Sequence, residues 1–354
     1  MRKLWLLPLL ICANPASGSA LGGAAGPQPP ASARTAELAF EAVPDRMVEP
    51  QPSPPATAAA SPQDADSEPL EEIIIQRPEP FFVAPTRRDR IGRIWAPVYI
   101  NGRGPFRLVL DSGANHSGIT AQVAQALDLP PDTAHPVLLR GVTGTATVAT
   151  VRVDSLNVGN IALDGTLLPI LTDPLGGAQG ILGTEWLTDQ RIYIDFRYDT
   201  IIIAPSRRQR AERGSITIPF KLTRQHLIVV DTRVGGVSTK AIIDTGGQIT
   251  IGNLALRDAL LRHSPRGPGT PAEVEGVTRD IQTGSLVPTP PIDMDGLLIR
   301  DNGITYADLR IFQYWGMTRQ PVLLVGMDVL GLLDTLVIDY RRQELQVSIG
   351  GGAR

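Results

Sequence analysis

The chain has 354 residues, of which 42% are hydrophobic, and its formal net charge is −3. The length and composition fit a globular protein with one or two cores, and the charge gives no electrostatic basis for binding nucleic acid or an anionic membrane. The single cysteine is Cys12, and the four histidines are scattered, with none at metal-ligand spacing from another His or Cys. The sequence therefore predicts no disulfide, no thiol catalysis and no zinc site in the mature chain.

Residues 1–20 have the pattern of a secretory signal peptide. Residues 1–3 are short and positive, residues 4–13 are apolar but too short to span a bilayer, and small residues follow. Cleavage after Ala13 and cleavage after Ala20 both fit the pattern. No later segment is long and apolar enough to cross a membrane, so we expect an exported soluble chain without stable membrane insertion. The periplasm fits best, and secretion is the alternative.

Residues 21–79 are rich in Ala, Pro, Gly and Ser and show no apolar periodicity. Segments such as Glu49–Pro55 cannot bury enough apolar surface to offset the entropy lost on ordering. The composition predicts a disordered segment, which is either a tether or a pro-segment.

Residues 80–204 and 215–350 follow the same order of elements and are joined by a charged linker at 205–214. Each half starts with two strands around a tight turn, continues with a short helix and a hairpin, and ends with a glycine-bearing segment, a final helix and two strands. Many short strands between Gly and Pro turns predict a mostly β fold. The opening strands are expected at 94–100, 105–110, 227–234 and 240–243, and the first helices at 121–129 and 254–262.

Two short stretches, residues 108–114 and 241–247, are near-copies of each other. Each runs an apolar strand into Asp-Ser/Thr-Gly, and the two aspartates, Asp111 and Asp244, lie 133 residues apart. A single motif of this kind is usually an ordinary turn. Two copies in equivalent contexts predict a duplicated fold that brings two carboxylates together, an arrangement suited to acid–base chemistry.

Further repeats follow each aspartate. A Gly-Val-Thr sequence begins 30 residues after Asp111 and 32 residues after Asp244, and strand-like sequence on both sides marks each as a hairpin tip. A hydrophobic segment with a central glycine, Gly183 or Gly326, comes near the end of each half. The tip residues are Gly141, Val142, Thr143 and Gly144 in the first half, and Gly276, Val277 and Thr278 in the second.

These motifs, which together cover roughly residues 91–349, resemble the retropepsin-like aspartic proteases, in particular bacterial exported forms with two retropepsin-like halves in one chain. The resemblance implies a mostly β fold of two similar acid-protease-like β-barrel halves that form a pseudo-twofold dimer with the active site between them. It implies an aspartic endopeptidase that hydrolyses peptide bonds in extended protein segments. Such an enzyme needs no cofactor and no metal, takes a protein or peptide as substrate, and is here expected to be a monomer.

The resemblance also implies residue roles. Asp111 and Asp244 match the catalytic dyad, in which each half supplies one aspartate. The hydroxyl groups that follow them lock the two loops together, and the next glycines allow close approach. The matching residues are Ser112 and Thr245 for the hydroxyls, Gly113 and Gly246 for close approach, Gly183 and Gly326 for the glycine beneath each Asp loop, and the seven tip residues for the flaps.

The sequence departs from this pattern in the second half. The region 270–312 is longer than its counterpart and contains Pro288–Pro291, and Gln313–Gly316 has no match in the first half. Two other functions stay open, a non-catalytic peptide-binding module on the same scaffold and a structural envelope protein with a periplasm-spanning tether. Both aspartates and both loop hydroxyls are present, which favours the enzyme.

Overall fold

The computed structural model describes residues 3–5, 11–13, 82–85, 92–159, 161–172, 176–263, 269–300 and 302–349, the first three ranges by their backbone alone. The segment predicted at 21–79 lies outside these residues, as does most of the predicted signal peptide. Within the described ranges, no helix is long and apolar enough to span a membrane.

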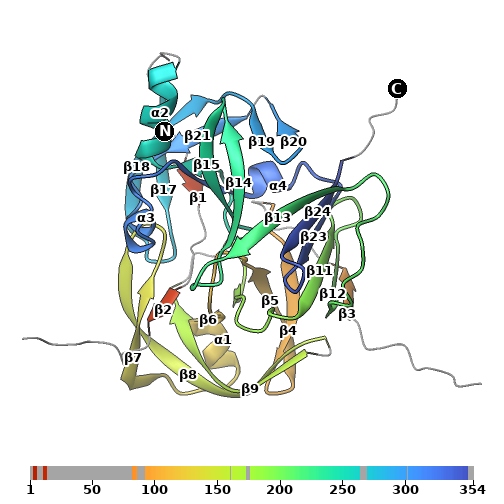
Figure 1. Ribbon diagram of the computed structural model, residues 1–354. Coiled ribbons are helices and arrows are strands. Elements are labelled where there is room, and N and C mark those ends of the chain that lie inside the picture. The colour runs from red at the N-terminus through yellow and green to blue at the C-terminus, as the bar shows by residue number, and fades with distance from the viewer. Residues whose placement is uncertain are drawn as a thin grey trace, which may run out of the picture. The chain divides into compact units, whose positions relative to one another are not determined.

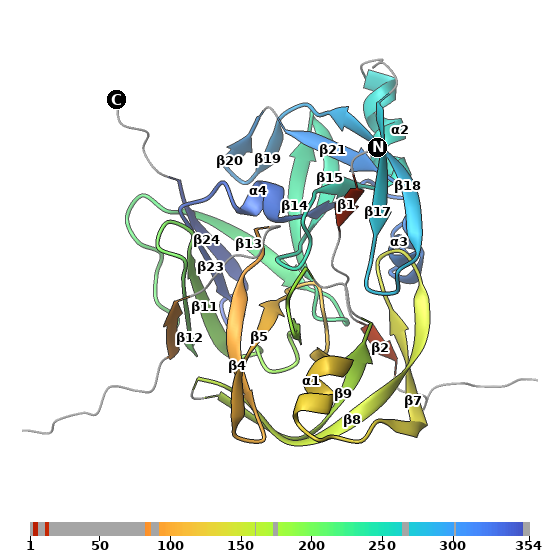
Figure 2. The same ribbon diagram turned by 180° about the vertical axis from the view of Figure 1, so that it is seen from behind.

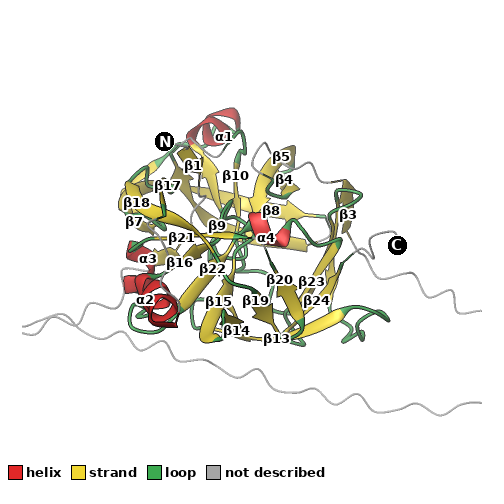
Figure 3. Ribbon diagram, turned by 90° about the horizontal axis from the view of Figure 1, so that it is seen from above, coloured by secondary structure: helices red, strands yellow, loops and turns green. Residues whose placement is uncertain are grey.

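The fold is mostly β, as predicted, and strands make up most of the described chain (Figure 3). In the first half, β9 pairs back with β8, so β8, β4, β5, β10, β6 and β9 close into a barrel (Figure 1). The helix α1 (Ala121–Ala126) follows β6, with the Thr120 hydroxyl accepting a bond from the Val123 N–H. The strands are β4 (Trp95–Ile100), β5 (Arg103–Leu110), β6 (Gly118–Thr120), β7 (Asp132–Arg140), β8 (Thr145–Val158), β9 (Ile161–Leu171) and β10 (Gly180–Leu182).

The second half repeats this connectivity. The first half pairs its strands in the order β7-β8-β9-β6-β10-β5-β4, and the second in the order β17-β18-β21-β16-β22-β15-β14. The two similar halves predicted from the repeated motifs are therefore confirmed. The strands are β14 (Ile228–Val234), β15 (Val237–Ile243), β16 (Ile251–Gly252), β17 (Thr270–Glu275), β18 (Ile281–Pro288), β19 (Ile292–Met294), β20 (Leu297–Ile299), β21 (Gly303–Tyr306) and β22 (Val322–Val325).

Tight turns set the register of the opening strands in both halves. Asn101 and Gly102 have φ values of 49° and 72°, and Gly235 and Gly236 have 54° and 84°. Two successive residues with positive φ make the turn whose twist matches a β-hairpin, and Asn and Gly tolerate this conformation best. As a result β5 begins at Arg103, two residues earlier than the sequence predicts.

The prolines of the second half divide one strand into two. The first-half strand β8 runs unbroken through 14 residues, whereas its counterpart is split into β18 and β19 around Pro288–Pro291. Proline has no N–H to donate to a strand ladder, so the pairing stops there. The short β19 then pairs with β14 and β20 instead of continuing the hairpin.

The two halves share a sheet. Strands β13 (Ile216–Leu222), β24 (Glu344–Ser348), β23 (Thr335–Asp339), β11 (Gln190–Asp195), β12 (Thr200–Pro205) and β3 (Phe82–Pro85) lie in this order, and β11 pairs with β23 (Figure 1). The connecting residues 206–214 contain no helix or strand, and within them the Ser206 hydroxyl donates to both carboxylate oxygens of Asp339, at 2.7 and 2.9 Å. This shared sheet fixes the halves against each other.

The remaining helices all belong to the second half. They are α2 (Leu254–His263), α3 (Arg310–Tyr314) and α4 (Met327–Leu330). The sequence predicts a helix after Gly183 as well, but residues 184–189 form turns, because only six residues connect Gly183 to β11.

Two backbone segments near the N-terminus extend the sheets. The strand β1 (Lys3–Trp5) pairs with β17, and β2 (Ile11–Ala13) pairs with β7.

Candidate active site

The two Asp loops begin where β5 and β15 end. Strand β5 lies parallel to β10, and β15 lies parallel to β22, so each loop starts beside a glycine-bearing segment. The Asp111 N–H donates to the Leu182 carbonyl at 3.0 Å, and the Asp244 N–H donates to the Val325 carbonyl at 3.0 Å. Both aspartates are fully buried, and their carboxyl groups lie close enough for the charge of Asp244 to act on Asp111. The structure thus brings together the two aspartates that lie far apart in the sequence.

The hydroxyl residues after the aspartates cross-link the two loops. Ser112 Oγ donates to the Ile243 carbonyl at 2.8 Å and accepts from the Thr245 N–H at 3.1 Å. Thr245 Oγ1 donates to the Leu110 carbonyl at 2.7 Å and accepts from the Ser112 N–H at 3.0 Å. These four buried bonds hold the ends of β5 and β15 at a fixed separation.

Glycine is required where the loops approach each other and their supports. A side chain on Gly246 would overlap the carboxyl group of Asp111. A Cβ on Gly183 would lie 2.7 Å from the His116 carbonyl oxygen, and one on Gly326 would lie 2.6 Å from the Ile249 carbonyl oxygen. Since real Cβ atoms do not approach so closely, larger residues at these positions would displace the Asp loops.

Backbone amides hold one oxygen of each aspartate. Asp111 Oδ1 accepts from the Gly113 N–H at 2.8 Å, and Asp244 Oδ1 accepts from the N–H groups of Gly246 and Gly247 at 3.0 and 2.9 Å. Within the described residues, no protein N–H or O–H group donates to Oδ2 of either aspartate. One oxygen of each carboxyl is therefore fixed by its own loop, and the other is left for the neighbouring carboxyl or a bound molecule.

Burial makes ionisation of this pair costly. Burial raises the pKa of Asp111 well above its usual range, and the negative charge of Asp244 raises it further. Burial also raises the pKa of Asp244, to about 6. Two adjacent carboxyls cannot both ionise easily, so the pair keeps one proton after its first member has ionised.

A buried cation, Arg93, acts on both aspartates. Its side chain is fully buried, and it precedes Ile94, whose carbonyl accepts a bond from the Leu110 N–H at 2.9 Å. The positive charge of Arg93 lowers the pKa of Asp111 and of Asp244, against the larger effect of burial. The role of Arg93 could not be predicted from the sequence, because an arginine before a strand carries no signal of its own.

The hairpins β7–β8 and β17–β18, termed the first and second hairpin, meet at their tips. Gln282 Nε2 donates to the Thr143 carbonyl at 3.2 Å. A Cβ on Gly276 would lie 2.7 Å from Thr143 Oγ1, and one on Gly141 would lie 3.1 Å from Thr278 Cγ2. The two predicted tips therefore lie against each other, and small residues permit that contact.

A second pair of acids supports the far ends of the Asp loops. The Ser117 N–H donates to Glu185 at 2.8 Å, and the Thr250 N–H donates to Asp328 at 2.9 Å. The hydroxyl groups of the same two residues, Ser117 Oγ and Thr250 Oγ1, accept from the N–H groups of Gly183 and Gly326 at 3.0 and 3.2 Å. Burial raises the pKa of Glu185 and of Asp328.

Glu185 and Asp328 are not among the site residues predicted from the sequence. A signal was present, since each acid stands two residues after the glycine of the repeated segment and each hydroxyl stands six residues after its aspartate. Repetition of polar residues at matched positions thus marks the loop supports as well as the dyad.

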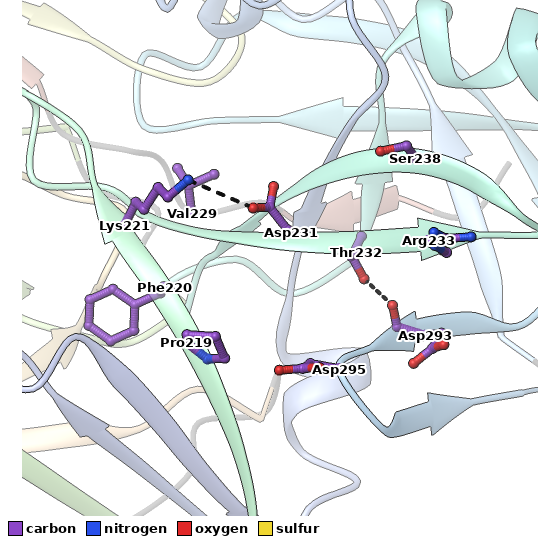
Figure 4. A pocket seen from close by; sticks show the side chains of 10 residues that line it. All are labelled: Pro219, Phe220, Lys221, Val229, Asp231, Thr232, Arg233, Ser238, Asp293 and Asp295. Atoms are coloured by element: carbon purple, nitrogen blue, oxygen red, sulfur yellow. Dashed lines mark hydrogen bonds and ion pairs between the residues drawn. The ribbon is translucent and has the colours of Figure 1, made fainter.

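A hollow on the second half lies apart from these residues. It has a volume of about 460 Å³ and is lined by β13, β14, β15 and the β19–β20 turn, with none of the residues discussed above in its wall (Figure 4). Lys221 forms an ion pair with Asp231 across it. In the described ranges no cluster of three or more His, Cys, Asp or Glu residues is placed to hold a metal ion.

Comparison with known proteins bears on the first half. The family model described as aspartyl protease matches residues 96–186, which include Asp111 and Gly183. This confirms, for that segment, the resemblance predicted from the repeated Asp motifs. The aspartyl protease match ends before Asp244, whose assignment depends on the geometry described above.

No curated protein sequence matches the chain. Among solved structures, the chain is similar to the crystal structure of Basic 7S globulin from soybean, with 13% sequence identity and a TM-score of 0.42. That similarity covers 78% of this chain and 98% of the globulin.

Proposed function

We propose that the protein is an aspartic endopeptidase and that Asp111 and Asp244 are its catalytic dyad. The observation that carries this proposal is the pair of buried, interacting carboxyls at the ends of two cross-linked Asp-Ser/Thr-Gly loops. The aspartyl protease match over 96–186 supports it independently.

In the proposed reaction, the carboxyl that retains its proton donates a hydrogen bond to the carbonyl oxygen of the scissile peptide bond. The ionised carboxyl accepts a proton from a water molecule, whose oxygen attacks the carbonyl carbon. The proton then passes to the leaving nitrogen as the C–N bond breaks, giving a carboxylic acid and an amine. This chemistry needs one shared proton, which the raised pKa values of the pair favour, and it forms no covalent intermediate with the protein.

The proposed flaps are the two hairpins, which close over an extended peptide and exclude water. Peptides in an extended conformation suit such a site because their backbone pairs with strand edges. Export by the predicted signal peptide, action in the periplasm and a monomeric state belong to the same proposal, as does a protein or peptide substrate.

The test is incubation of the purified full chain with a diverse peptide pool at pH 4 to 7, followed by mass spectrometry of the products. We expect internal cleavage that a statine-type inhibitor suppresses, because its hydroxyl group mimics the attacked carbonyl. Binding of peptides without any cleavage across this pH range would contradict the peptidase and leave a peptide-binding module.

A further inference from the structure

The tip of each hairpin packs against the half of the chain to which that hairpin does not belong. Val142, from the first hairpin, is fully buried in a hydrophobic cluster of which every other described member belongs to the second half. Val277, from the second hairpin, is 1% exposed and lies in a first-half cluster that includes Ala114, three residues after Asp111. Each tip is therefore anchored beside the Asp loop of the opposite half.

The carbonyl of each tip valine accepts a hydrogen bond from the opposite half. The Ile311 N–H donates to the Val142 carbonyl at 3.4 Å, and Thr172 Oγ1 donates to the Val277 carbonyl at 2.7 Å. Thr172 follows β9, and Ile311 lies in α3, which follows β21, the counterpart of β9. The two anchors thus occupy corresponding places but differ in construction.

The helix α3 makes the first anchor larger. Ile311 and Phe312 are each 1% exposed in the cluster around Val142, and Phe312 packs edge-to-face on Trp315 with ring centroids 6.0 Å apart. In both Figure 1 and Figure 2 the loop of the first hairpin, in yellow, reaches α3. The segment 313–316, which has no counterpart in the first half, therefore lies at the end of α3 and forms part of the surface on which the first hairpin packs.

A cation–π contact completes this anchor. The guanidinium carbon of Arg140 lies 4.4 Å from the centre of the Tyr314 ring. Arg140 is the last residue of β7, directly before the tip glycine Gly141, and its Nε is buried without a hydrogen-bond partner in the described part of the chain. A guanidinium that has lost water gains more from an aromatic face than an exposed one does.

We propose that Tyr314 is a positioning residue that holds the first hairpin closed through Arg140. The proposal rests on the proposed function in that the first hairpin is taken to be a flap of the peptidase. Opening of the first hairpin must break the Arg140–Tyr314 contact and withdraw Val142 from its cluster.

The test is backbone hydrogen exchange on the full chain without substrate, which reads the opening of each hairpin whether or not the protein cleaves peptides. Tyr314→Ala is expected to speed exchange of the β7–β8 amides about tenfold. This factor corresponds to the free energy that a partly desolvated cation–π pair contributes to the closed state. Exchange in β17–β18 and in the shared sheet should stay as in the wild type. Tyr314→Phe, which keeps the ring face, should restore slow exchange, and the exposed Tyr198→Ala serves as the matched control.

Arg140→Met tests the same contact from the other side. It should speed β7–β8 exchange to the same extent, and the double variant with Tyr314→Ala should be no faster, because both changes remove one contact. Unchanged exchange in Tyr314→Ala, equal acceleration in both hairpins, or multiplied effects in the double variant would overturn the proposal. Accelerated β7–β8 exchange in a chain that cleaves no peptide would support the role of Tyr314 and contradict the peptidase alone.

Discussion

Replacement of Asp244 by asparagine should stabilise the protein at neutral pH while it abolishes cleavage. Asp244 is fully buried, and burial raises its pKa from 3.8 to about 6. The folded chain then binds this proton more tightly than the unfolded chain does. Stability is accordingly lost as the pH rises from about 4 through 6, because folding must then take up a proton or bury the charge.

The magnitude follows from the size of the shift. A change of about two pKa units corresponds to roughly 3 kcal/mol of unfolding free energy at pH values above 6. Asparagine keeps the oxygen that accepts from the Gly246 and Gly247 N–H groups, and its amide can donate to Asp111. The substitution therefore removes the buried charge without removing the hydrogen bonds.

Urea unfolding at pH 4 and at pH 7.5 measures this effect. We expect Asp244→Asn to match the wild type at pH 4 and to exceed it by a few kcal/mol at pH 7.5, with Asp164→Asn, at an exposed position on β9, unchanged at both. Equal stability of Asp244→Asn and the wild type at both pH values would refute the reasoning, since it would mean that burial does not raise the pKa of this carboxyl. Destabilisation at both pH values would refute it as well.

Three further substitutions test the loops. Thr245→Val should lower the unfolding free energy by about 1–3 kcal/mol, because the Leu110 carbonyl and the Ser112 N–H lose a buried partner. Thr245→Ser should restore most of this stability, and an unchanged urea midpoint for the valine variant would contradict the cross-link. Gly246→Ala should reduce kcat/KM by about 100-fold or more, because its methyl group displaces the Asp111 carboxyl, and near-native turnover would show that the loops have room. Arg93→Met should move the basic limb of the kcat/KM profile to higher pH, because burial then raises the pKa of the dyad without the opposing positive charge. Arg93→Lys keeps the charge and should leave this limb in place. Identical basic limbs for the wild type and Arg93→Met would rule out an electrostatic role of Arg93.

Local patterns explain why much of the fold is predictable from the sequence. Asn101-Gly102 and Gly235-Gly236 favour the positive φ values of tight turns, and apolar strands on either side lead directly to Asp111 and Asp244. Repetition of this pattern indicates two similar halves. The proline run at 288–291 marks the position where the second half departs from the first.

Contacts between the halves beyond the two Asp loops could not be predicted in this way. The sequence predicts Val142 and Val277 only as hairpin-tip residues, yet each is buried in the opposite half. Arg93 acts on the dyad only because the folded chain buries it there, and Arg140 meets Tyr314 across 174 residues of sequence. Such contacts depend on how two rigid halves are placed, which no local periodicity encodes.

The most direct test of the central claim compares kcat/KM for one cleaved peptide among the wild type, Asp111→Asn, Asp244→Asn and the double variant. If the two carboxyls act as one unit, each single substitution should reduce kcat/KM by about 1,000-fold or more, and the double variant should be no worse than either. Near-native turnover in either single variant, or losses that multiply in the double variant, would contradict a shared catalytic dyad.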